Sequence, residues 1–404
     1  MTQESKPLVI LALPKHDDSF TSTPYQLAKE LAQEREVWYV SHPYTWIDFL
    51  KNIQKKKAWK RFWAGWPFGL VVELIEQERL RILYLPLTLP INAFPPGKLY
   101  NLLSALNHYW VAGTLQRLIR RKQLTEYVFI NSHDFYLGRI HRWLPRPSLY
   151  IYHCIDPIIK AYSARHGHYL EKEAASEADV VVTTSPFLER KMKQYHAKSY
   201  CVPNAANFAL SHRVTLTETE PHSTVQKISG SRIGYIGNIE RRINYSWLTE
   251  IFTRRVDWQL VMVGPRNDQY IPESFRQLPN VHFVPPVPHE ELPKVLKAFD
   301  IALIPFTKDD VSAQIYPLKL FEYMGSGKPV VTTDFNWEVI APFQDDIYVG
   351  TTVEELERAI ENALTESGED SAQRRIDIAS QNDWAARGRQ LSELINEHTY
   401  AKAH

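Results

Sequence analysis

The chain alternates short apolar runs with polar loops and amphipathic segments. Runs of about four to eight apolar residues, bounded by Gly, Pro or charged residues, are typical of parallel strands buried on both faces. Apolar residues spaced three and four apart predict helices that pack on such strands. The pattern predicts strands at 8–13, 37–40, 127–130, 149–152, 180–184, 200–203, 232–237, 259–263, 301–305 and 330–333.

Helical segments separate most of these strands, so the chain predicts two doubly wound α/β layers. A length of 404 residues also fits two to three domains. A polar stretch without periodicity, 211–231, lies between the two sets of strands. We therefore expect a Rossmann-like N-terminal domain (1–205), a linker (206–231), a second Rossmann-like domain (232–383) and a C-terminal helix that crosses back onto domain one (384–404).

The segment 301–334 is where the chemistry is easiest to interpret. Its pattern is strand, polar loop, helix and strand, and Pro317 stands where the first helical turn begins. A helix that opens after the carboxyl end of a strand presents unpaired N–H groups and a partial positive charge, which suits a phosphate. Lys319 adds a cation in the first turn. Glu322 offers a carboxylate that can accept hydrogen bonds from paired sugar hydroxyls.

The run PLKLFEYMGSGKPVV, at 317–331, resembles the nucleotide-sugar site of GT-B glycosyltransferases, and most of all that of the family 4-like (group 1) enzymes. The resemblance extends over roughly 8–384 and is strongest at 232–334. It implies a GT-B fold, with two Rossmann-like domains facing across a cleft. It also implies that the helix start at Pro317 and Leu318, with Lys319, holds the donor diphosphate and that Glu322 holds the ribose hydroxyls.

Other donor-site residues follow from the same resemblance. Gly237 ends a strand, where a glycine lets the backbone approach a ligand. Asn238, Arg241 and Arg242 fall where the family places basic residues on the diphosphate. Gly264 and Pro265 fall where the nucleotide base stacks.

Two features concern the donor sugar and the metal. The wider family carries a second glutamate eight residues before Glu322, and this chain has Gln314 there, so its recognition of the donor sugar departs from the pattern. The sequence contains no Asp-x-Asp, the metal-holding motif of the other glycosyltransferase fold. We therefore expect no metal and no cofactor beyond a nucleoside-diphosphate sugar as co-substrate, because cations and helix N–H groups can stabilise a diphosphate leaving group.

In the first domain the run LYIYHCID, at 149–156, looks like the family's tyrosine–histidine–aspartate run that faces the reacting sugar. It implies that His153 hydrogen-bonds the transferred sugar and that Asp156 orients the acceptor hydroxyl or accepts its proton. His133 and Asp134 follow the preceding strand and are further candidates by position. The first loop has Ser-Thr-Pro at 22–24 where relatives often carry an arginine, which leaves the role of that loop open.

The segment 46–68 interleaves aromatic and basic residues, as interfacial membrane segments do. A second basic group, at 117 and 120–122, closes the predicted helix 99–121. We expect these patches to dock on an anionic membrane surface. Tryptophans packed on the domain beside solvated lysines are the alternative. Binding of single-stranded nucleic acid is disfavoured by a net charge of +1. The basic residues are Lys51, Lys55, Lys56, Lys57, Lys60 and Arg61, and the aromatic ones Trp46, Phe49, Trp59, Phe62, Trp63, Trp66 and Phe68.

The cysteines and the apolar runs bear on the cellular compartment in which the protein is expected. Cys154 and Cys201 lie far apart without metal-ligand spacing, which supports neither a disulfide framework nor a zinc site. The short apolar run near the N-terminus predicts a strand and not a signal peptide. No uninterrupted apolar window is long enough for a transmembrane helix. We expect a cytoplasmic protein that is peripheral on the inner face of the cell membrane.

Together these features predict a metal-independent glycosyltransferase of the hexosyltransferase type, and the resemblance implies that it retains the configuration of the transferred sugar. It would move a sugar from a nucleoside-diphosphate sugar to a hydroxyl of a glycan or lipid-linked acceptor, in cell-surface polysaccharide biosynthesis. Two alternatives remain. One is a nucleotide-sugar epimerase on the same fold. The other is a non-catalytic glycan-assembly partner, kept open by Gln314 and by the first loop.

Overall fold

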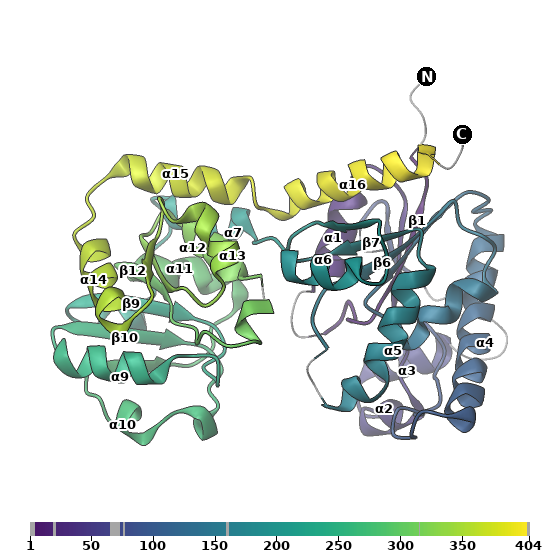
Figure 1. Cartoon of the computed structure of the whole chain (residues 1–404), viewed down its shortest axis with the longest axis horizontal. Helices are drawn as coiled ribbons and strands as arrows, with labels where there is room; N and C mark the ends of the chain where they lie inside the picture. Colours follow the sequence, from purple (N-terminus) through teal and green to yellow (C-terminus); the bar gives the residue numbers. More distant parts are fainter. Residues whose placement is uncertain are drawn as a thin grey trace. The chain divides into compact units, whose positions relative to one another are not determined.

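The computed structural model describes residues 5–18, 22–64, 73–75, 77–158, 161–314 and 316–401. The chain forms two compact units (Figure 1). The N-domain contains Met1–Pro203 and Arg387–His404, and the C-domain contains Asn204–Ala386. Each domain is built on its own sheet, as the two sets of apolar runs predict.

The N-domain sheet has the order β3-β4-β2-β1-β5-β6-β7-β8 and is parallel except for β3, which pairs antiparallel with β4. Two of its strands, β3 and β4, are not among those that the sequence pattern predicts. The strands are β1 (Leu8–Ala12), β2 (Val37–Ser41), β3 (Glu73–Ile75), β4 (Leu80–Leu83), β5 (Val128–Ser132), β6 (Leu149–Cys154), β7 (Val180–Thr183) and β8 (Ser199–Cys201).

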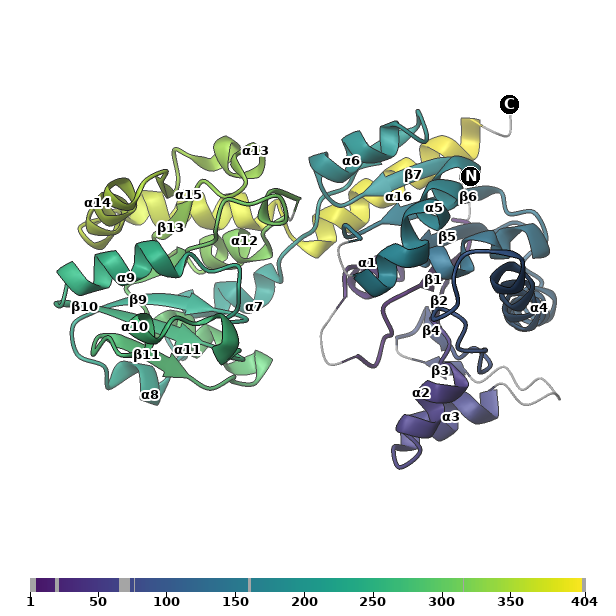
Figure 2. The same cartoon turned by 60° about the horizontal axis from the view of Figure 1, so that its bottom comes forward.

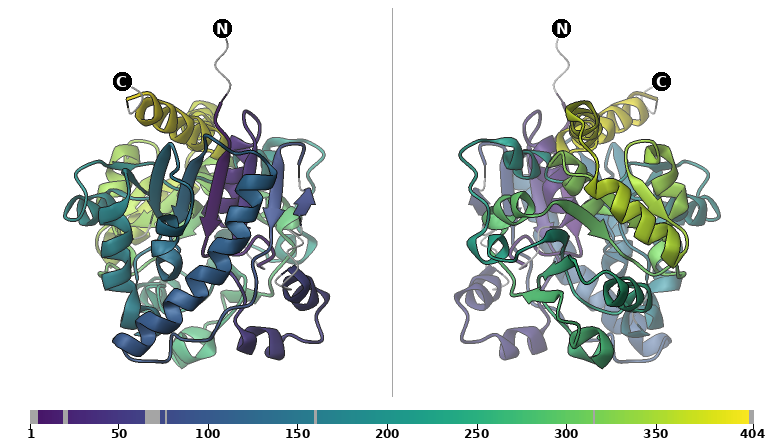
Figure 3. Two further views of the ribbon diagram at one scale, coloured as in Figure 1. Left: turned by 90° about the vertical axis from the view of Figure 1, so that its right-hand side faces the viewer. Right: turned by 90° about the vertical axis from the view of Figure 1, so that its left-hand side faces the viewer.

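Helices cover both faces of this sheet. On one face Leu115 of α4 shares a core with Val9 of β1 and Phe129 of β5, and Figure 3 shows α4 lying across the strands. On the other face Tyr25 of α1 packs edge-on against Tyr39 of β2. The helices are α1 (Thr23–Leu31), α2 (Trp46–Lys51), α3 (Lys56–Ala64), α4 (Lys98–Arg121), η1 (Phe135–Trp143), α5 (Ala161–Glu177), α6 (Pro186–Lys193) and α16 (Trp384–Ala401).

The C-domain sheet is wholly parallel, in the order β11-β10-β9-β12-β13-β14, with helices on both faces (Figure 2). The strands are β9 (Ser231–Ile236), β10 (Trp258–Val263), β11 (Val281–Val284), β12 (Ile301–Ile304), β13 (Val330–Thr333) and β14 (Tyr348–Gly350). The helices are α7 (Phe208–His212), η2 (Arg213–Thr215), α8 (Ser223–Gln226), α9 (Tyr245–Arg254), η3 (Asp268–Tyr270), α10 (Glu273–Arg276), η4 (His289–Glu291), α11 (Leu292–Ala298), η5 (Ser312–Gln314), α12 (Leu318–Gly325), α13 (Trp337–Ile340), η6 (Ala341–Phe343), α14 (Val353–Leu364) and α15 (Glu369–Ser380).

Both sheets contain a point where the strand order reverses. In the N-domain the chain builds outward from β1 through β2, then returns to place β5 on the other side of β1. In the C-domain it builds outward from β9 through β10, then returns to place β12 beside β9. Open α/β sheets bind their ligands at the carboxyl ends of the strands at such a point. The two candidate regions are therefore the loops after β1 and β5, and those after β9 and β12.

The segment 206–231, expected as a linker, folds as part of the C-domain. It forms α7, η2 and α8 before β9 begins at Ser231. Val214 and Val225 are buried in the C-domain core. The physical reason is that a few apolar residues at irregular spacing can be buried by short helices, although they show no periodicity in the sequence.

The basic, aromatic segment forms α2 and α3, whereas 65–72, with Trp66 and Phe68, lies outside the described residues. Its rings pack on one another, with Phe49 and Phe62 stacked at 5.0 Å between centroids. Arg61, expected among the surface cations, is fully buried and forms an ion pair with Asp17. It also lies over the rings of Tyr44 and Tyr84, at 4.5 and 5.2 Å from their centroids. The sequence pattern does not show this burial, because it depends on a long-range contact between α3 and the loop after β1.

Gly234 on β9 allows a test of how closely the core of the C-domain is packed. A Cβ atom at this position would lie 1.9 Å from the buried ring of Phe299. We expect Gly234→Ala to lower the free energy of unfolding by about 3 kcal/mol, because a close-packed core resists added volume. Urea unfolding measures this. Gly113→Ala is the matched control, because its Cβ would meet nothing within 4 Å, and it should be neutral or stabilising. A change of only a few tenths in Gly234→Ala would contradict the packing.

Candidate active site

The loop after β9 is held at the carboxyl edge of the C-domain sheet from both sides. The backbone N–H of Ile239 donates to the carbonyl of Pro265, after β10, at 2.8 Å. The N–H of Thr307, after β12, donates to the carbonyl of Arg242 at 2.7 Å. The loops of three neighbouring strands therefore form one connected rim, which fixes the position of the predicted donor residues.

Two glycines make this rim possible. Gly237 and Gly264 have φ of +147° and +143°, in the region that favours glycine. A Cβ on Gly264 would lie 2.2 Å from the carbonyl oxygen of Gly237, and a Cβ on Gly237 would lie 2.5 Å from Cε of Lys319. The glycines thus allow the two strand ends and the lysine of α12 to lie against one another.

Helix α12 starts at the same edge without a capping side chain. Pro317 is its N-cap residue, with φ −80° and ψ 100°, so the helix begins at Leu318 and not, as the sequence predicts, at the proline itself. The N–H of Leu320 donates to the carbonyl of Pro317 at 3.2 Å. The first turn contains no acidic residue. The partial positive charge of this helix end is therefore not offset by its own side chains.

Lys319 and Glu322 lie three residues apart on α12, a spacing that puts side chains on the same face of a helix. Burial lowers the pKa of Lys319, and the nearby carboxylate of Glu322 opposes that shift. Within the described part of the chain, no carboxylate forms an ion pair with the Lys319 ammonium and the Glu322 carboxylate accepts no hydrogen bond. The hydroxyl of Tyr323, buried beneath them, accepts from the N–H of Ile236 at 2.8 Å and fixes the helix to β9.

The predicted basic residues after β9 differ in their surroundings. The guanidinium of Arg242 pairs with Glu240 at 2.9 Å and lies 5.3 Å from the ring centroid of Phe306. Arg241 is exposed, and so is Asn238, whose carbonyl accepts from the hydroxyl of Tyr235 at 2.9 Å. Arg242 is therefore an oriented cation of the rim, whereas Arg241 is a surface cation.

The remaining donor candidates are on the loops after β10 and β12. Pro265 is exposed beside Gly264, as a surface that stacks on a ligand must be. The side-chain amide of Gln314, in η5, donates to the carbonyl of Asp310 at 2.7 Å. The structure thus brings the donor candidates to one edge of the C-domain, with Gln314 bonded within its own loop.

In the N-domain, His153 lies within β6 and not after it, because the strand extends to Cys154. The imidazole is 2% exposed, and its Nδ1 lies 2.9 Å from the hydroxyl of Ser132. Burial lowers the pKa of His153 to about 3, so the ring is neutral at physiological pH. Its Nε2 has no hydrogen-bond partner in the described part of the chain. Asp156 is exposed two residues beyond β6. Desolvation by the surrounding protein still raises the pKa of its carboxyl to about 6.

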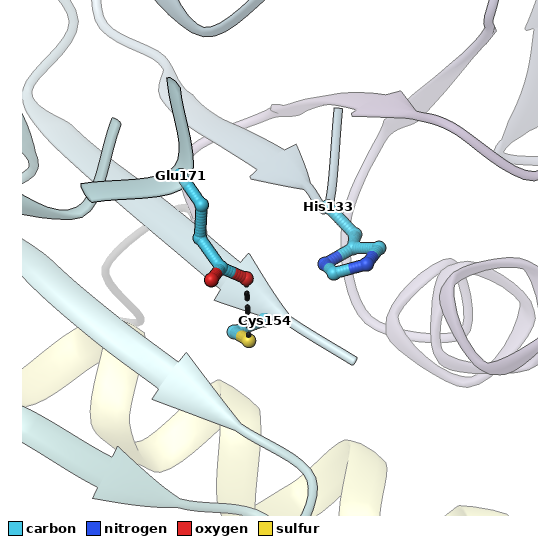
Figure 4. Close-up of side chains that lie close together, drawn as sticks. All are labelled: His133, Cys154 and Glu171. Atoms are coloured by element: carbon cyan, nitrogen blue, oxygen red, sulfur yellow. Dashed lines mark hydrogen bonds between the residues drawn. The ribbon is translucent and has the colours of Figure 1, made fainter. Parts of the chain in front are cut away.

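A buried cluster of His133, Cys154 and Glu171 lies at the ends of β5 and β6 (Figure 4). One potential ligand atom of each lies within 4.8 Å of the others. The thiol of Cys154 donates to Glu171 at 3.4 Å, and the ammonium of Lys191 donates to the other carboxylate oxygen at 2.5 Å. Burial raises the pKa of the thiol well above its usual value. A cation here would have to displace both the ammonium and the thiol proton. We therefore describe Cys154, Glu171 and Lys191 as a hydrogen-bond network, beside which Nδ1 of His133 is buried without a partner in the described chain.

Asp134 has a histidine partner, His42, that the sequence pattern did not indicate. The buried carboxylate accepts from the N–H of Leu137 at 3.2 Å and lies 2.7 Å from Nδ1 of His42. His42 directly follows β2, so its position after a predicted strand was the available signal. His133 and Asp134 are adjacent in the sequence, but Asp134 contacts His42 whereas the ring of His133 packs edge-on against Phe135.

Comparisons with known proteins give this geometry a context. Residues 230–366 match the family model described as glycosyl transferases group 1. A relative from Bacillus subtilis (strain 168), named "Putative teichuronic acid biosynthesis glycosyltransferase TuaH", is 26% identical over 240 residues. That alignment covers 57% of this chain and 60% of the relative.

Solved structures show the fold. The sucrose-phosphate synthase from Thermosynechococcus elongatus matches with a TM-score of 0.65 at 15% identity, over 98% of this chain and 100% of that one. An α,α-trehalose-phosphate synthase (UDP-forming) from Burkholderia vietnamiensis matches with a TM-score of 0.66 at 9% identity, over 98% and 99%. The GT-B fold expected from the sequence is confirmed, and the matched family segment contains the rim and α12.

The two buried histidines predict how stability depends on pH. Burial lowers the pKa of His133 to about 4 and that of His153 to about 3, so below pH ~6.5 the unfolded chain binds protons that the folded chain does not. Each histidine stabilises the fold above pH ~6.5, and this contribution is lost as the pH falls, at a slope approaching about 1.4 kcal/mol per pH unit.

Urea unfolding between pH 7 and pH ~4.5 measures this slope. His133→Asn is the informative variant, because the backbone φ of +61° at this position suits asparagine. It should remove one histidine's share of the slope. An unchanged slope in that variant would show that His133 is not held neutral in the fold.

Proposed function

We propose that this chain, a GT-B protein with a glycosyl transferases group 1 segment, is a glycosyltransferase. It moves a sugar from a nucleoside-diphosphate sugar to a hydroxyl of a glycan or lipid-linked acceptor. The bond between the anomeric carbon and the donor phosphate oxygen breaks, and the nucleoside diphosphate leaves with the bonding electrons. The acceptor oxygen bonds to the same carbon and loses its proton.

One observation carries the proposal: the rim brings together an uncapped helix start, a lysine without an ion pair and a carboxylate without a hydrogen bond in the described chain. Lys319 supplies a positive charge that no described carboxylate pairs within ion-pair distance, and Glu322 supplies a carboxylate that accepts no hydrogen bond in the described chain. A donor diphosphate at the helix start would pair with Lys319, and the ribose hydroxyls would donate to Glu322. Arg242, fixed by Glu240, adds a second cation for the leaving group. These charges support a mechanism that needs no metal.

The N-domain residues have properties that fit the reacting groups. The neutral His153 ring has an Nε2 without a partner in the described chain, which a sugar hydroxyl would supply. With a pKa of about 6, Asp156 is mostly ionised at pH 7 and can orient the acceptor hydroxyl or take its proton. Retention of configuration is part of the proposal and rests on the resemblance of 149–156 to the group 1 run.

The acceptor side of the proposal rests on the relative and on the N-domain surface. The relative's name assigns it to teichuronic acid biosynthesis, so we propose a cell-surface polysaccharide as the product class. Within the described residues, no helix has the length and hydropathy to cross a membrane. Trp59 and Trp63 of α3 are 41% and 55% exposed beside exposed lysines. We propose that this face docks on the anionic inner leaflet of the cell membrane.

Substitution of Glu322 tests the donor site. We expect nucleoside diphosphates and their sugars, without metal, to raise the melting temperature of the wild-type protein, with one base preferred. Glu322→Gln should weaken binding of that nucleotide about 100-fold, because it removes two hydrogen bonds to a charged acceptor. Titration calorimetry measures the affinity.

The control is Glu290→Gln, a change at an exposed glutamate of the same domain. It should bind the nucleotide as the wild type does. Unchanged affinity in Glu322→Gln would remove the ribose assignment. Absence of stabilisation by every nucleotide would favour a non-catalytic partner that keeps the fold.

Flotation with vesicles tests the membrane face. The protein should float with phosphatidylglycerol vesicles, less so with phosphatidylcholine, and less as salt rises. Changing Lys56 and Lys60 together to glutamine should weaken partitioning about 30-fold, because each lysine near an anionic leaflet contributes about 1 kcal/mol. The control changes Lys198 and Lys227, exposed on other surfaces, to glutamine. Equal binding to neutral and anionic vesicles would overturn the electrostatic docking.

A further inference from the structure

Beyond the donor site, the N-domain carries a hollow of about 450 Å³ that the reaction does not use. We call it the α4 groove. It lies between the start of α2, the loop after β4, α4 and the end of η1. The residues that carry the argument are Trp46, Leu87, Trp110, Gly113, Arg117 and Trp143. Its volume falls within the roughly 300–1,000 Å³ of sites that enclose small organic ligands.

The walls of the groove are mainly apolar and open to solvent. The side chains of Trp46, Trp110 and Trp143 are 43%, 38% and 41% exposed. Large aromatic side chains normally bury most of their surface, so three half-exposed indoles around one hollow indicate an apolar ligand. The groove also continues an exposed apolar stripe on α4, formed by Leu99, Leu102, Leu106 and Tyr109.

Gly113 forms part of the groove where α4 faces it. A Cβ at this position would meet no atom within 4 Å, so the helix leaves open space there. Glycine is unfavourable inside a helix, and a larger residue would be more stable there by helix propensity. The open position is thus a place where side-chain bulk can be added to the groove without straining the helix.

The groove has a positive end. The guanidinium of Arg117 lines it and donates to the hydroxyl of Thr114 at 3.2 Å, while its Nε is buried without a partner in the described chain. Arg120 and Arg121 follow on the exposed end of α4. The sequence of α4 contains no acidic residue, and no described carboxylate pairs with these three arginines. An apolar groove that ends in arginines without carboxylate partners in the described chain matches a molecule with a long hydrocarbon chain and an anionic group.

The groove also lies close to the sheet edge where a doubly wound domain binds ligands. Trp46 follows β2, which ends at Ser41, and Leu87 follows β4, which ends at Leu83. Thr45 and Thr88, their neighbours in the chain, pair in an isolated bridge. The Trp46 end of the groove is therefore near the carboxyl edge of the sheet, whereas Arg117 lies toward the end of α4 that leads into the start of β5, at the opposite edge.

We propose that the α4 groove binds the hydrocarbon chain of an anionic, phosphate-bearing lipid of the membrane, with the phosphate at Arg117. The inference rests on the membrane docking in the proposed function and narrows it, because it names the lipid chemistry that the N-domain binds. Membrane docking through α2 and α3 would place the groove at the surface from which such a lipid is taken.

The experiment uses the full-length protein and dodecyl phosphate brominated near the end of its chain. Bromine quenches indole fluorescence on contact, and three tryptophans line the groove. The probe should quench the wild-type protein saturably. Gly113→Leu should weaken its apparent Kd about tenfold or more, the effect of leaving roughly two methylene groups in water. Ala105→Leu, at an exposed position on the same helix outside the groove, is the matched control and should bind as the wild type does.

Arg117→Gln tests the positive end. It should weaken binding of the brominated dodecyl phosphate while leaving binding of the equally brominated dodecanol unchanged. Inorganic phosphate should compete poorly, because it lacks the chain. Equal quenching of Gly113→Leu and the wild type would overturn the proposal and assign the chain to the open surface. Equal loss of the phosphate and the alcohol in Arg117→Gln would overturn the role of the anionic group.

Nucleotide-induced stabilisation of Gly113→Leu separates this inference from the proposed function. A wild-type protein that binds no nucleotide while its groove binds the lipid probe contradicts the glycosyltransferase. A protein that binds nucleotide but whose probe affinity is insensitive to Gly113→Leu contradicts the groove alone.

Discussion

The contact between Lys319 and Gly237 is the constraint on which the candidate donor site depends. A Cβ at position 237 would lie 2.5 Å from Cε of the lysine, so a larger residue there would displace the lysine and strain a backbone with φ of +147°. The same glycine lies against Gly264, so one close approach fixes β9, β10 and α12 relative to one another. Because these elements are packed, the helix start and the lysine charge are placed before any ligand arrives. Preorganised charge of this kind stabilises a leaving group without reorganisation during the reaction.

The N-domain depends on a different kind of interaction. Asp17, in the loop after β1, is joined to the buried Arg61 of α3, and the coulombic effect of that arginine helps to lower the pKa of Asp17 against the opposing effect of burial. Breaking such a pair would leave a buried guanidinium without its partner, which is costly. The pair therefore ties the helix that carries the exposed tryptophans to a loop at the ligand edge of the sheet.

The sequence predicted the repeating local parts of the molecule and missed long-range contacts. Apolar runs identified most strands, and the start of α12 was placed within one residue because proline and glycine mark helix ends. Arg61 was grouped with the surface lysines because spacing does not show that Asp17, more than forty positions earlier, would bury it. His42 was missed for the same reason, since its partner Asp134 comes from another strand. β3 was missed because it has only three residues, and β4 because Arg81 interrupts its apolar run.

The distribution of unpaired charge links the two proposals. The chain has a net charge of only +1, and many of its surface arginines pair with carboxylates, as Arg254 does with Glu357 and Arg139 with Glu173. Against this background Lys319 and Arg117 stand out, because each lies beside a concave or uncapped feature and forms no ion pair with a described carboxylate. Paired surface charges contribute little to stability, whereas a partly buried charge without a partner has a cost that a ligand can offset. Phosphate is the common chemistry that would satisfy both, as a donor diphosphate at Lys319 and as a lipid phosphate at Arg117.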